Sequence, residues 1–494
     1  MTDQGKKAYK MYIDGAWVDA LDGTTIEVID PATEESIATV AYGAVEDARV
    51  AIMAARRAFD DGPWPRMSVI ERSDLLIAAA AKLRERGDDI ARLETLEMGK
   101  LFGDAQGDIG DTLSALETAA RAIAGHHGEQ VNIAAPEAFA AVAREPVGVV
   151  VGITPWNFPL MLASWKFAFA LAAGNVVIMK PATISPLTTL EMARIFEEVG
   201  IPAGVFQVLV GPGGSVGDEL SSSPLVDMVT LTGSLEVGRQ VMRNAAVNIK
   251  KVGLELGGKS PNIVFADADA EAAVQGALWG AFANAGQVCS AGSRVLVERA
   301  IYDDFLSELV KRANAIKVGP GLDPESEMGP LSSAAQLATT ERYVAIGLKE
   351  GARLACGGKR IQSEKGCYFQ PTIFADVDNK MIIAQEEIFG PVLVVIPFED
   401  EKEAVSIAND TIYGLAAGVW SKDASKAMRV ARALQAGMVW VNTFFWSPAE
   451  LPWGGYKQSG LGREMGSFGL DEFTEVKSII VDTTGEPIGL YTAD

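Results

Sequence analysis

Short apolar runs alternate with stretches of helical periodicity through the middle of the chain. The runs VGVVVGITP and NVVIMKP are apolar at almost every position, which is typical of strands buried on both faces, and PLMLASWKFAFALAAG between them has the length of a packed helix. The alternation continues with a helix over 186–200, strands over 204–211 and 225–234, a helix over 235–246 and a strand over 250–258. Strands separated by single helices predict a parallel, doubly wound sheet, whose ligands lie beyond the carboxyl ends of the strands. The residues at these ends are Thr154, Lys180, Gly211, Thr232 and Glu255.

Residues 253–260, GLELGGKS, have the spacing G-x-x-x-x-G-K-[ST] of a loop that wraps the phosphates of a nucleotide. Such a loop requires a helix to begin at its Lys-Ser pair. Here Ser260 is followed by Pro261 and an extended apolar run, so we interpret the match as accidental. What remains is Glu255, which is either an exposed strand residue or, with a suitable partner, a base.

Composition and charge exclude several classes of function. The 494 residues are 48% hydrophobic and carry a formal charge of −22, which would repel nucleic acid and anionic membranes. The N-terminal MTDQGKKAYKMYIDG has no apolar core of signal-peptide length, so we expect a cytoplasmic protein with no nucleic-acid and no membrane partner. The three cysteines, Cys289, Cys356 and Cys367, are too scattered for a disulfide framework or a paired zinc site, and we expect no metal.

Histidine is scarce. His126 and His127 are the only two, and they lie at the polar end of a predicted helix, where we interpret them as solvated or structural. A second motif, GGSVG at 213–217, fits the nucleophile elbow of α/β-hydrolases. That fold needs a histidine after the serine, whereas both histidines precede Ser215, so we reject a hydrolase.

Cys289, in AFANAGQVCSAGSRV, is the candidate nucleophile, although a buried structural cysteine is the usual alternative for a lone thiol. A nucleophilic thiol needs a base or a lowered pKa, and with histidine excluded a carboxylate such as Glu255 is the natural base. Acyl chemistry also needs a donor to the developing oxyanion, and Asn157 in ITPWNFP is a suitable amide at a strand end.

Seven motifs in order along the chain resemble the NAD(P)-dependent aldehyde dehydrogenase superfamily. They are PWNFP (155–159), MKPAT (179–183), LTGSLEVG (231–238), LELGGKSP (254–261), GQVCSAGSR (286–294), EEIFGPV (386–392) and PWGGYKQSGLGRE (452–464). The resemblance implies an α/β fold in three parts. These are a Rossmann-type cofactor-binding domain (1–124 and 147–257), an α/β catalytic domain (258–457) and a small β bridging element for oligomerisation (125–146 and 458–494). It also implies a homodimer or homotetramer.

By this resemblance Cys289 is the nucleophile that attacks an aldehyde to give a thiohemiacetal. Asn157 and the Cys289 backbone N–H hold the oxyanion, and Glu255 activates the water that hydrolyses the later thioester. Glu464 resembles a second carboxylate that relays protons or positions Glu255, with a salt-bridged surface residue as the alternative.

The cofactor implied is NAD or NADP. The positions matching its contacts are Trp156, Lys180, Thr183, Gly213, Gly217, Gly233, Ser234, Glu387 and Phe389. Many NAD-preferring relatives have Glu three residues after the Lys, where this chain has Thr183. A carboxylate there would repel a 2′-phosphate and Thr can donate to one, so we expect NADP to be accepted, with or without NAD.

The aldehyde itself is less constrained. The positions expected to line an aromatic tunnel are Phe158, Met161, Trp165, Val288, Ser290, Phe445 and Trp453. We expect first an apolar, aromatic or medium-chain aldehyde. The alternative is a betaine or amino-aldehyde, because SPAELP resembles betaine aldehyde dehydrogenases and aromatic rings near Glu450 would suit a quaternary ammonium. With no Arg or Lys expected among these positions, a carboxylate-bearing semialdehyde is disfavoured.

Three rival functions remain to be distinguished from this one. A phosphate-loop NTPase would depend on Lys259 and not on Cys289, and a non-catalytic relative is expected to have lost Cys289 or Glu255. A relative that forms acyl-coenzyme A often lacks the base, so Glu255 favours hydrolysis.

Overall fold

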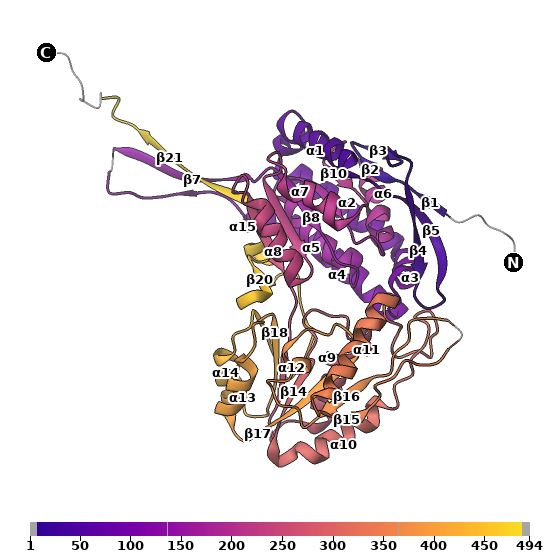
Figure 1. Cartoon of the computed structure of the whole chain (residues 1–494). Coiled ribbons are helices and arrows are strands. Elements are labelled where there is room, and N and C mark those ends of the chain that lie inside the picture. Colours follow the sequence, from indigo (N-terminus) through magenta and orange to yellow (C-terminus); the bar gives the residue numbers. More distant parts are fainter. Residues whose placement is uncertain (1–6, 136, 364, 487–494) are drawn as a thin grey trace.

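The computed structural model describes residues 7–135, 137–363 and 365–486. Two α/β bodies lie one above the other, and a narrow β ribbon projects from the upper one (Figure 1). The upper body contains the sequence up to β12 together with a C-terminal segment, and the lower one is built from the residues between them.

An eight-stranded sheet forms the centre of the upper body, in the order β20-β12-β11-β8-β9-β10-β2-β3. The five central strands are parallel, and their almost complete burial accounts for the apolar runs that predict them. The outer strands β20, β2 and β3 pair antiparallel with their neighbours. The strands are β2 (Met11–Ile13), β3 (Ala16–Val18), β8 (Val149–Ile153), β9 (Val176–Lys180), β10 (Phe206–Val208), β11 (Met228–Thr232), β12 (Lys251–Glu255) and β20 (Gly460–Leu461).

Helices cover both faces of this sheet, and a small sheet in the order β1-β5-β4 lies at its side. The helix predicted over 186–200 is α6, which begins after Pro186 and ends at Gly200 in a left-handed conformation (φ 86°) that glycine adopts without strain. The elements are β1 (Lys7–Tyr9), β4 (Thr25–Asp30), β5 (Glu35–Ala41), α1 (Val45–Asp60), η1 (Trp64–Arg66), α2 (Val69–Glu85), α3 (Gly87–Met98), α4 (Phe102–Ala122), η2 (Ile123–Gly125), α5 (Pro159–Ala172), α6 (Leu187–Val199), η3 (Gly213–Gly217), α7 (Asp218–Ser222), α8 (Leu235–Ala245) and α15 (Gly466–Glu472).

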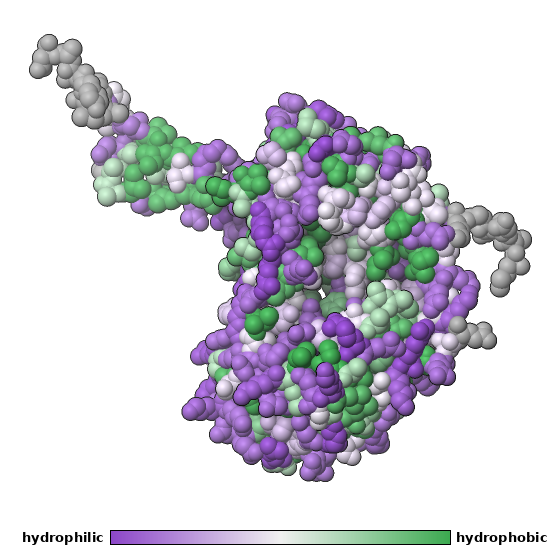
Figure 2. All heavy atoms as spheres, viewed as in Figure 1, coloured by the Kyte–Doolittle hydropathy of each residue, from purple (hydrophilic) through white to green (hydrophobic). Residues whose placement is uncertain are grey.

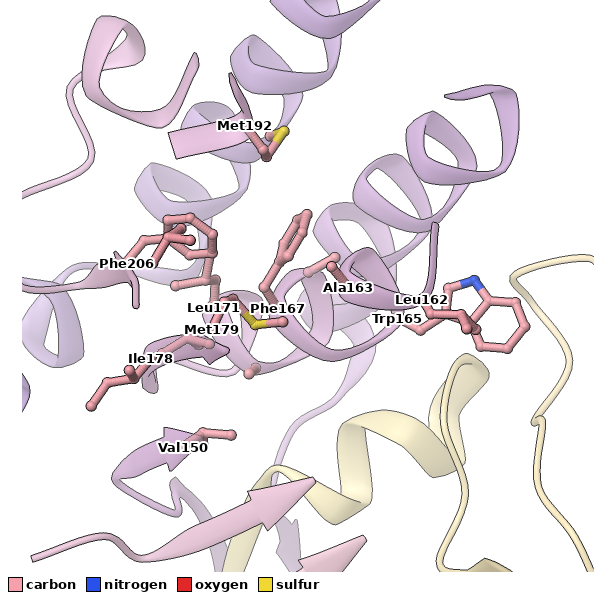
Figure 3. Close-up of a cluster of buried hydrophobic side chains, with 14 of the residues drawn as sticks. Val150, Leu162, Ala163, Trp165, Phe167, Leu171, Ile178, Met179, Met192 and Phe206 are labelled. Carbon is pink, nitrogen blue, oxygen red and sulfur yellow. The ribbon is translucent and has the colours of Figure 1, made fainter. Parts of the chain in front are cut away.

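Helix α5 connects the core of the upper body to the region between the two bodies. Phe167 and Leu171 point into the cluster around Met179 and Phe206, whereas Trp165 points away from it toward the C-terminal segment (Figure 3). There Trp165 packs on Trp453, with ring centroids 5.5 Å apart. Helix α5 therefore packs into the core of the upper body and also presents side chains to the region between the two bodies.

A seven-stranded sheet in the order β15-β16-β17-β14-β13-β18-β19 forms the lower body, with only β15 antiparallel to its neighbour. The elements are β13 (Pro261–Val264), α9 (Ala270–Phe282), η4 (Ala283–Gly286), β14 (Arg294–Glu298), η5 (Arg299–Ile301), α10 (Tyr302–Ala313), α11 (Ala334–Lys349), β15 (Arg353–Cys356), β16 (Thr372–Ala375), α12 (Ile382–Gln385), β17 (Val392–Phe398), α13 (Glu401–Asn409), β18 (Ala416–Trp420), α14 (Ala424–Ala433), β19 (Met438–Val441) and η6 (Lys457–Ser459).

The projecting ribbon, called the arm below, is a three-stranded antiparallel sheet of β6 (Glu129–Gln130), β7 (Ala138–Pro146) and β21 (Thr474–Asp482). Apolar side chains are exposed along it (Figure 2). They include Phe139, Val476, Ile479, Ile480 and Val481. The predicted bridging element contains all three strands, and it also contains β20, which pairs with β12 of the large sheet. The domain boundaries and the assembly of two or four copies through the arm stay predictions.

Candidate active site

The segment with the phosphate-loop spacing is a turn between two strands. Glu255 ends β12, Pro261 begins β13, and the residues between them form no helix, so the phosphate-loop alternative fails on structure. The two glycines allow close packing. A Cβ on Gly257 would lie 2.2 Å from a Glu387 carboxyl oxygen, and one on Gly258 would lie 2.5 Å from the Cys289 carbonyl oxygen. The turn therefore brings Glu255 and Glu387 to the cysteine segment.

Cys289 lies where two cavities meet. One cavity, of about 270 Å³, and another, of about 400 Å³, have Cys289 as their single lining residue in common. Its neighbours Val288 and Ser290 are buried, while Cys289 itself is partly exposed. A reactant in either cavity can therefore reach this thiol.

The thiol is protonated at neutral pH in this arrangement. Burial raises the pKa of Cys289 to about 12, and the Glu387 and Glu255 carboxyls raise it as well. Attack by Cys289 thus requires a proton acceptor or a nearby positive charge.

Glu255 is a buried carboxyl that lines the larger cavity. Burial raises its pKa well above the usual value, and so does the charge of Glu464. Its Oε2 has no hydrogen-bond partner within the ranges that the structure describes. A carboxyl with a raised pKa, facing a cavity beside a thiol, has the properties of a general base.

Glu464 lies behind Glu255 and is itself paired. Its Oε1 accepts hydrogen bonds from Lys166 Nζ and from Thr230 Oγ1 (3.0 Å), and the Lys166 ammonium also donates to Thr232 Oγ1 (2.7 Å). Glu464 is buried, so the surface salt bridge considered for it is wrong. Lys166 is absent from the sequence prediction, although a lysine within the fully buried α5 is a signal for a paired buried charge.

Asn157, the predicted oxyanion donor, is buried in the larger cavity. Its Nδ2 donates to the Gln287 carbonyl oxygen at 2.8 Å, which uses one of its two hydrogens. Asn157 and Cys289 line the same cavity, and no acceptor for the second hydrogen is present within the described residues.

The larger cavity contains five of the nine predicted cofactor residues: Trp156, Gly233, Ser234, Glu387 and Phe389. Ser234 caps α8, so the amino end of a helix faces the cavity and favours an anion there. Glu387 accepts a hydrogen bond from Gly258 N (3.1 Å), and burial raises its pKa to about 7. Phe389 lies edge-on to Trp156 with centroids 5.3 Å apart, on a left-handed backbone (φ 59°).

The other four predicted cofactor residues lie beyond this cavity, around the ends of β9 and β10. Lys180 is buried, its Nζ donates only to the Pro181 carbonyl oxygen (3.3 Å) within the described residues, and burial lowers its pKa to about 8. Thr183 donates to the Gly211 carbonyl oxygen at 3.4 Å, and a Cβ on Gly217 would lie 3.8 Å from Lys180 Cδ. Gly213 begins the η3 turn, with open space around its Cα. A buried ammonium with one weak acceptor suits the hydroxyls of a ribose, so these residues fit a dinucleotide.

All seven predicted tunnel residues line the smaller cavity. Trp279 lines it too, and its ring lies 6.2 Å from that of Phe445. Carboxyls of α4 complete the wall: Asp104, Asp108 and Asp111, spaced so that they share one helix face. This cavity is both aromatic and acidic.

One expectation about this cavity is wrong, and the predicted lining positions omit a lysine. Glu450 is exposed and does not line it, because the carboxylates near the aromatic rings come from α4 instead. A lysine does line it: Lys100 is buried with its Nζ 4.2 Å from the Phe158 ring centroid, and it pairs with Glu94 (3.0 Å) and Asp108. These two partners neutralise its charge.

The remaining sequence motifs lie outside both cavities. His126 contacts Asp471 (3.6 Å) at the base of the arm, His127 is exposed, and Ser215 lies in the η3 turn. Among the described residues, no group of three or more His, Cys, Asp or Glu side chains is placed to hold a metal ion, and no helix is long and apolar enough to cross a membrane.

Residues 17–479 match the sequence profile described as "Aldehyde dehydrogenase family". The chain belongs to the aldehyde dehydrogenase family. The α/β architecture predicted for that family is confirmed, and so is the interpretation of Gly253–Ser260 as an accidental match.

Relatives within this aldehyde dehydrogenase family cover nearly the whole chain. A Bacillus subtilis protein named betaine aldehyde dehydrogenase is 49% identical over 98% of this chain and 99% of its own, and a putative aldehyde dehydrogenase DhaS from the same organism is 43% identical over 97% and 96%. A solved structure of Staphylococcus aureus betaine aldehyde dehydrogenase in complex with NAD+ is 45% identical, covers 98% of this chain and 97% of that one, and has a TM-score of 0.97.

Proposed function

We propose that this aldehyde dehydrogenase oxidises betaine aldehyde, or a small ammonio-aldehyde like it, to the carboxylic acid with NAD+ or NADP+. The observation that carries the proposal is the position of Cys289 between an aromatic, acidic cavity and a cavity with the features of a dinucleotide site. The thiol, the oxyanion donor and the base all belong to this junction.

In the first step the Cys289 thiolate adds to the aldehyde carbon and forms a C–S bond. The carbonyl oxygen becomes an oxyanion, to which the free Nδ2–H of Asn157 and the Cys289 backbone N–H donate. The charges of two carboxylates raise the pKa of Cys289, that of Glu387 most and that of Glu255 next. Of the two, Glu255 accepts the thiol proton.

When bound, the nicotinamide supplies a hydride acceptor for the thiohemiacetal carbon, and a thioester to Cys289 results. Trp156, Glu387 and Phe389 would hold its ribose and ring, Ser234 the pyrophosphate, and Lys180 with Thr183 the adenosine ribose. Gly217 would leave room beside Lys180, and Gly213 would leave open space at the start of the η3 turn.

Hydrolysis of the thioester needs a base. Glu255 first releases the thiol proton to solvent. It then takes a proton from water as the water oxygen attacks the acyl carbon, and the C–S bond breaks to return the thiolate. Glu464, which pairs with Lys166, raises the pKa of Glu255 by its charge and so makes Glu255 a stronger base.

The smaller cavity favours a cation as the substrate's far end. Rings of Trp165, Trp279 and Trp453 offer π faces, and the α4 carboxyls outnumber the single Lys100 ammonium. The relatives named betaine aldehyde dehydrogenase point the same way. An apolar or medium-chain aldehyde, our first expectation from sequence, uses the rings but offers no charge to the carboxyls of Asp104 and Asp111, whereas Asp108 already pairs with Lys100.

The test is cofactor reduction by the purified chain, with NAD+ or NADP+ and a panel of betaine aldehyde, hexanal, benzaldehyde and succinic semialdehyde. Betaine aldehyde should give the highest kcat/KM, and Cys289→Ala should abolish the signal. A higher kcat/KM for hexanal would overturn the substrate, and reduction that survives in Cys289→Ala would overturn the mechanism.

A further inference from the structure

Three buried amide side chains form a closed set of hydrogen bonds at the cysteine segment. Asn157 Nδ2 donates to the Gln287 carbonyl oxygen (2.8 Å). Asn284 Nδ2 donates to the carbonyl oxygens of Asn157 (3.0 Å) and Gln287 (3.5 Å). Gln287 Nε2 donates to the Asn284 carbonyl oxygen (3.0 Å), and its Oε1 accepts from Ser332 N (2.9 Å). The set links the segment after β8, the cysteine segment and the segment before α11.

The backbone of the cysteine segment is shaped for these contacts. Asn284, Ala285 and Gly286 are left-handed in succession, with φ of 49°, 54° and 72°. Asparagine tolerates this conformation better than most residues, and a Cβ on Gly286 would lie 2.2 Å from the Gly390 carbonyl oxygen. The turn presents the Gln287 carbonyl to Asn157 two residues before the nucleophile.

We infer that Asn284 and Gln287 are positioning residues that fix the side-chain amide of Asn157 with its donor, and not its acceptor, available to the oxyanion at Cys289. A free asparagine amide turns readily about its last torsion, so either end can face a ligand. The Gln287 carbonyl can only accept, so it holds Nδ2 and excludes Oδ1. Asn157 Oδ1 accordingly has no partner within the described residues.

Asn284 fixes the other end of the same residue. By donating to the main-chain oxygen of Asn157 it ties that residue's backbone to the turn that carries Gln287. The backbone of Asn157 is thereby held to the turn that precedes Cys289. The inference deepens the proposed function, because it rests on Asn157 stabilising an oxyanion formed on the Cys289 adduct.

Two thiol reagents distinguish positioning of the Asn157 amide from a purely structural role of Asn284 and Gln287 in the cysteine segment. Attack of the Cys289 thiolate on p-nitrophenyl acetate forms an oxyanion before p-nitrophenolate leaves, whereas displacement of iodide from iodoacetamide forms none. Neither reagent needs a cofactor or an aldehyde, so their result is independent of whether betaine aldehyde is oxidised.

The variant Asn284→Gly removes the side-chain amide, and glycine adopts the positive φ of this position without strain. It should lower the acylation rate about tenfold and change the alkylation rate less than about twofold, since misorienting one oxyanion donor costs less than deleting it. In an Asn157→Ala background it should lower acylation no further. Equal losses in both reactions, or additive losses in the double variant, would overturn the inference.

A second variant and a matched control guard against unfolding. Gln287→Met, similar in size, loses both side-chain bonds and should lower the ratio of acylation to alkylation in the same direction. Asn175 is a buried asparagine outside both cavities whose Nδ2 also donates to two main-chain oxygens, of Ala170 (3.0 Å) and Phe473 (2.9 Å). Asn175→Gly should lower Tm and leave that ratio unchanged; a ratio that falls as far as in Asn284→Gly overturns the inference.

Discussion

The Glu464 carboxyl raises the pKa of the Glu255 carboxyl in front of it, while it is itself paired with Lys166. Burial acts on Glu255 in the same direction and more strongly. Both effects make the Glu255 carboxylate a stronger base than that of an ordinary glutamate.

Replacement of Glu255 by glutamine should separate hydrolysis from the earlier steps. Glu255→Gln should lower steady-state cofactor reduction about 10²- to 10⁴-fold, the usual contribution of a general base, because the thioester then waits for unassisted water. Rapid mixing should still show reduction of up to one cofactor per Cys289, at a lower rate, because solvent must then take the thiol proton that Glu255 accepts. A steady-state rate within about threefold of the unmodified enzyme would contradict the assignment of the base.

The same substitution should change how stability depends on pH. A carboxyl whose folded-state pKa is raised stabilises the protein fully below its unfolded pKa, and this stabilisation is lost as pH rises through the folded pKa. Glu255→Gln cannot ionise, so its Tm should exceed that of the unmodified chain at pH 8 by more than at pH 5. Thermal unfolding at both pH values checks this, and a gain larger at pH 5 would refute it.

The reactivity of Cys289 should follow its raised pKa. With a pKa of about 12, alkylation by iodoacetamide without cofactor should rise about tenfold per pH unit from pH 7 to 9, without a plateau. Glu387→Gln should speed alkylation, because Glu387 is the charge that raises this pKa most. Cys289→Ser is the control for labelling of the buried Cys356 and Cys367. A plateau below pH 9 would argue against a protonated resting thiol.

Cofactor choice should turn on Thr183. Thr183→Glu places a carboxylate near the adenosine ribose, and it should lower kcat/KM for NADP+ at least about tenfold through repulsion of the 2′-phosphate. The value for NAD+ should change little. The control is Thr183→Gln, whose side chain is as large as that of Thr183→Glu but carries no charge. An equal loss of kcat/KM for NADP+ in this control would show that side-chain size, and not charge, causes the effect.

The acidic wall of the smaller cavity should act on cations only. Asp104→Asn should raise KM for betaine aldehyde roughly fivefold, about 1 kcal/mol for a charge pair at a cavity mouth, and leave KM for hexanal unchanged. Burial raises the pKa of Asp104, so the effect should grow as pH rises and this carboxyl ionises. Asp89→Asn, an exposed change on α3, is the control. Equal changes for both aldehydes would be incompatible with a cation site.

The sequence predicts the elements of the upper sheet well because strands buried on both faces leave unbroken apolar runs. It also predicts Glu255, Asn157 and Cys289 as site residues. Glu255 ends a strand of this sheet and Asn157 follows one, whereas Cys289 follows a helix of the lower body. It does not reveal Lys100 or the α4 carboxyls, because nothing in a single sequence says that α4 packs against α5 and turns one face to the cavity. The sequence does contain one signal for these carboxyls, because the i, i+4, i+7 spacing of Asp104, Asp108 and Asp111 places them on one face of a helix.

The arrangement of the two cavities bears on the order of events after the chemistry. Because they meet at Cys289 alone, the carboxylic acid departs on one side of the thiol and the reduced dinucleotide on the other. Neither product blocks the exit of its companion, so the sequence of release is set by how tightly each is held and not by which entered last.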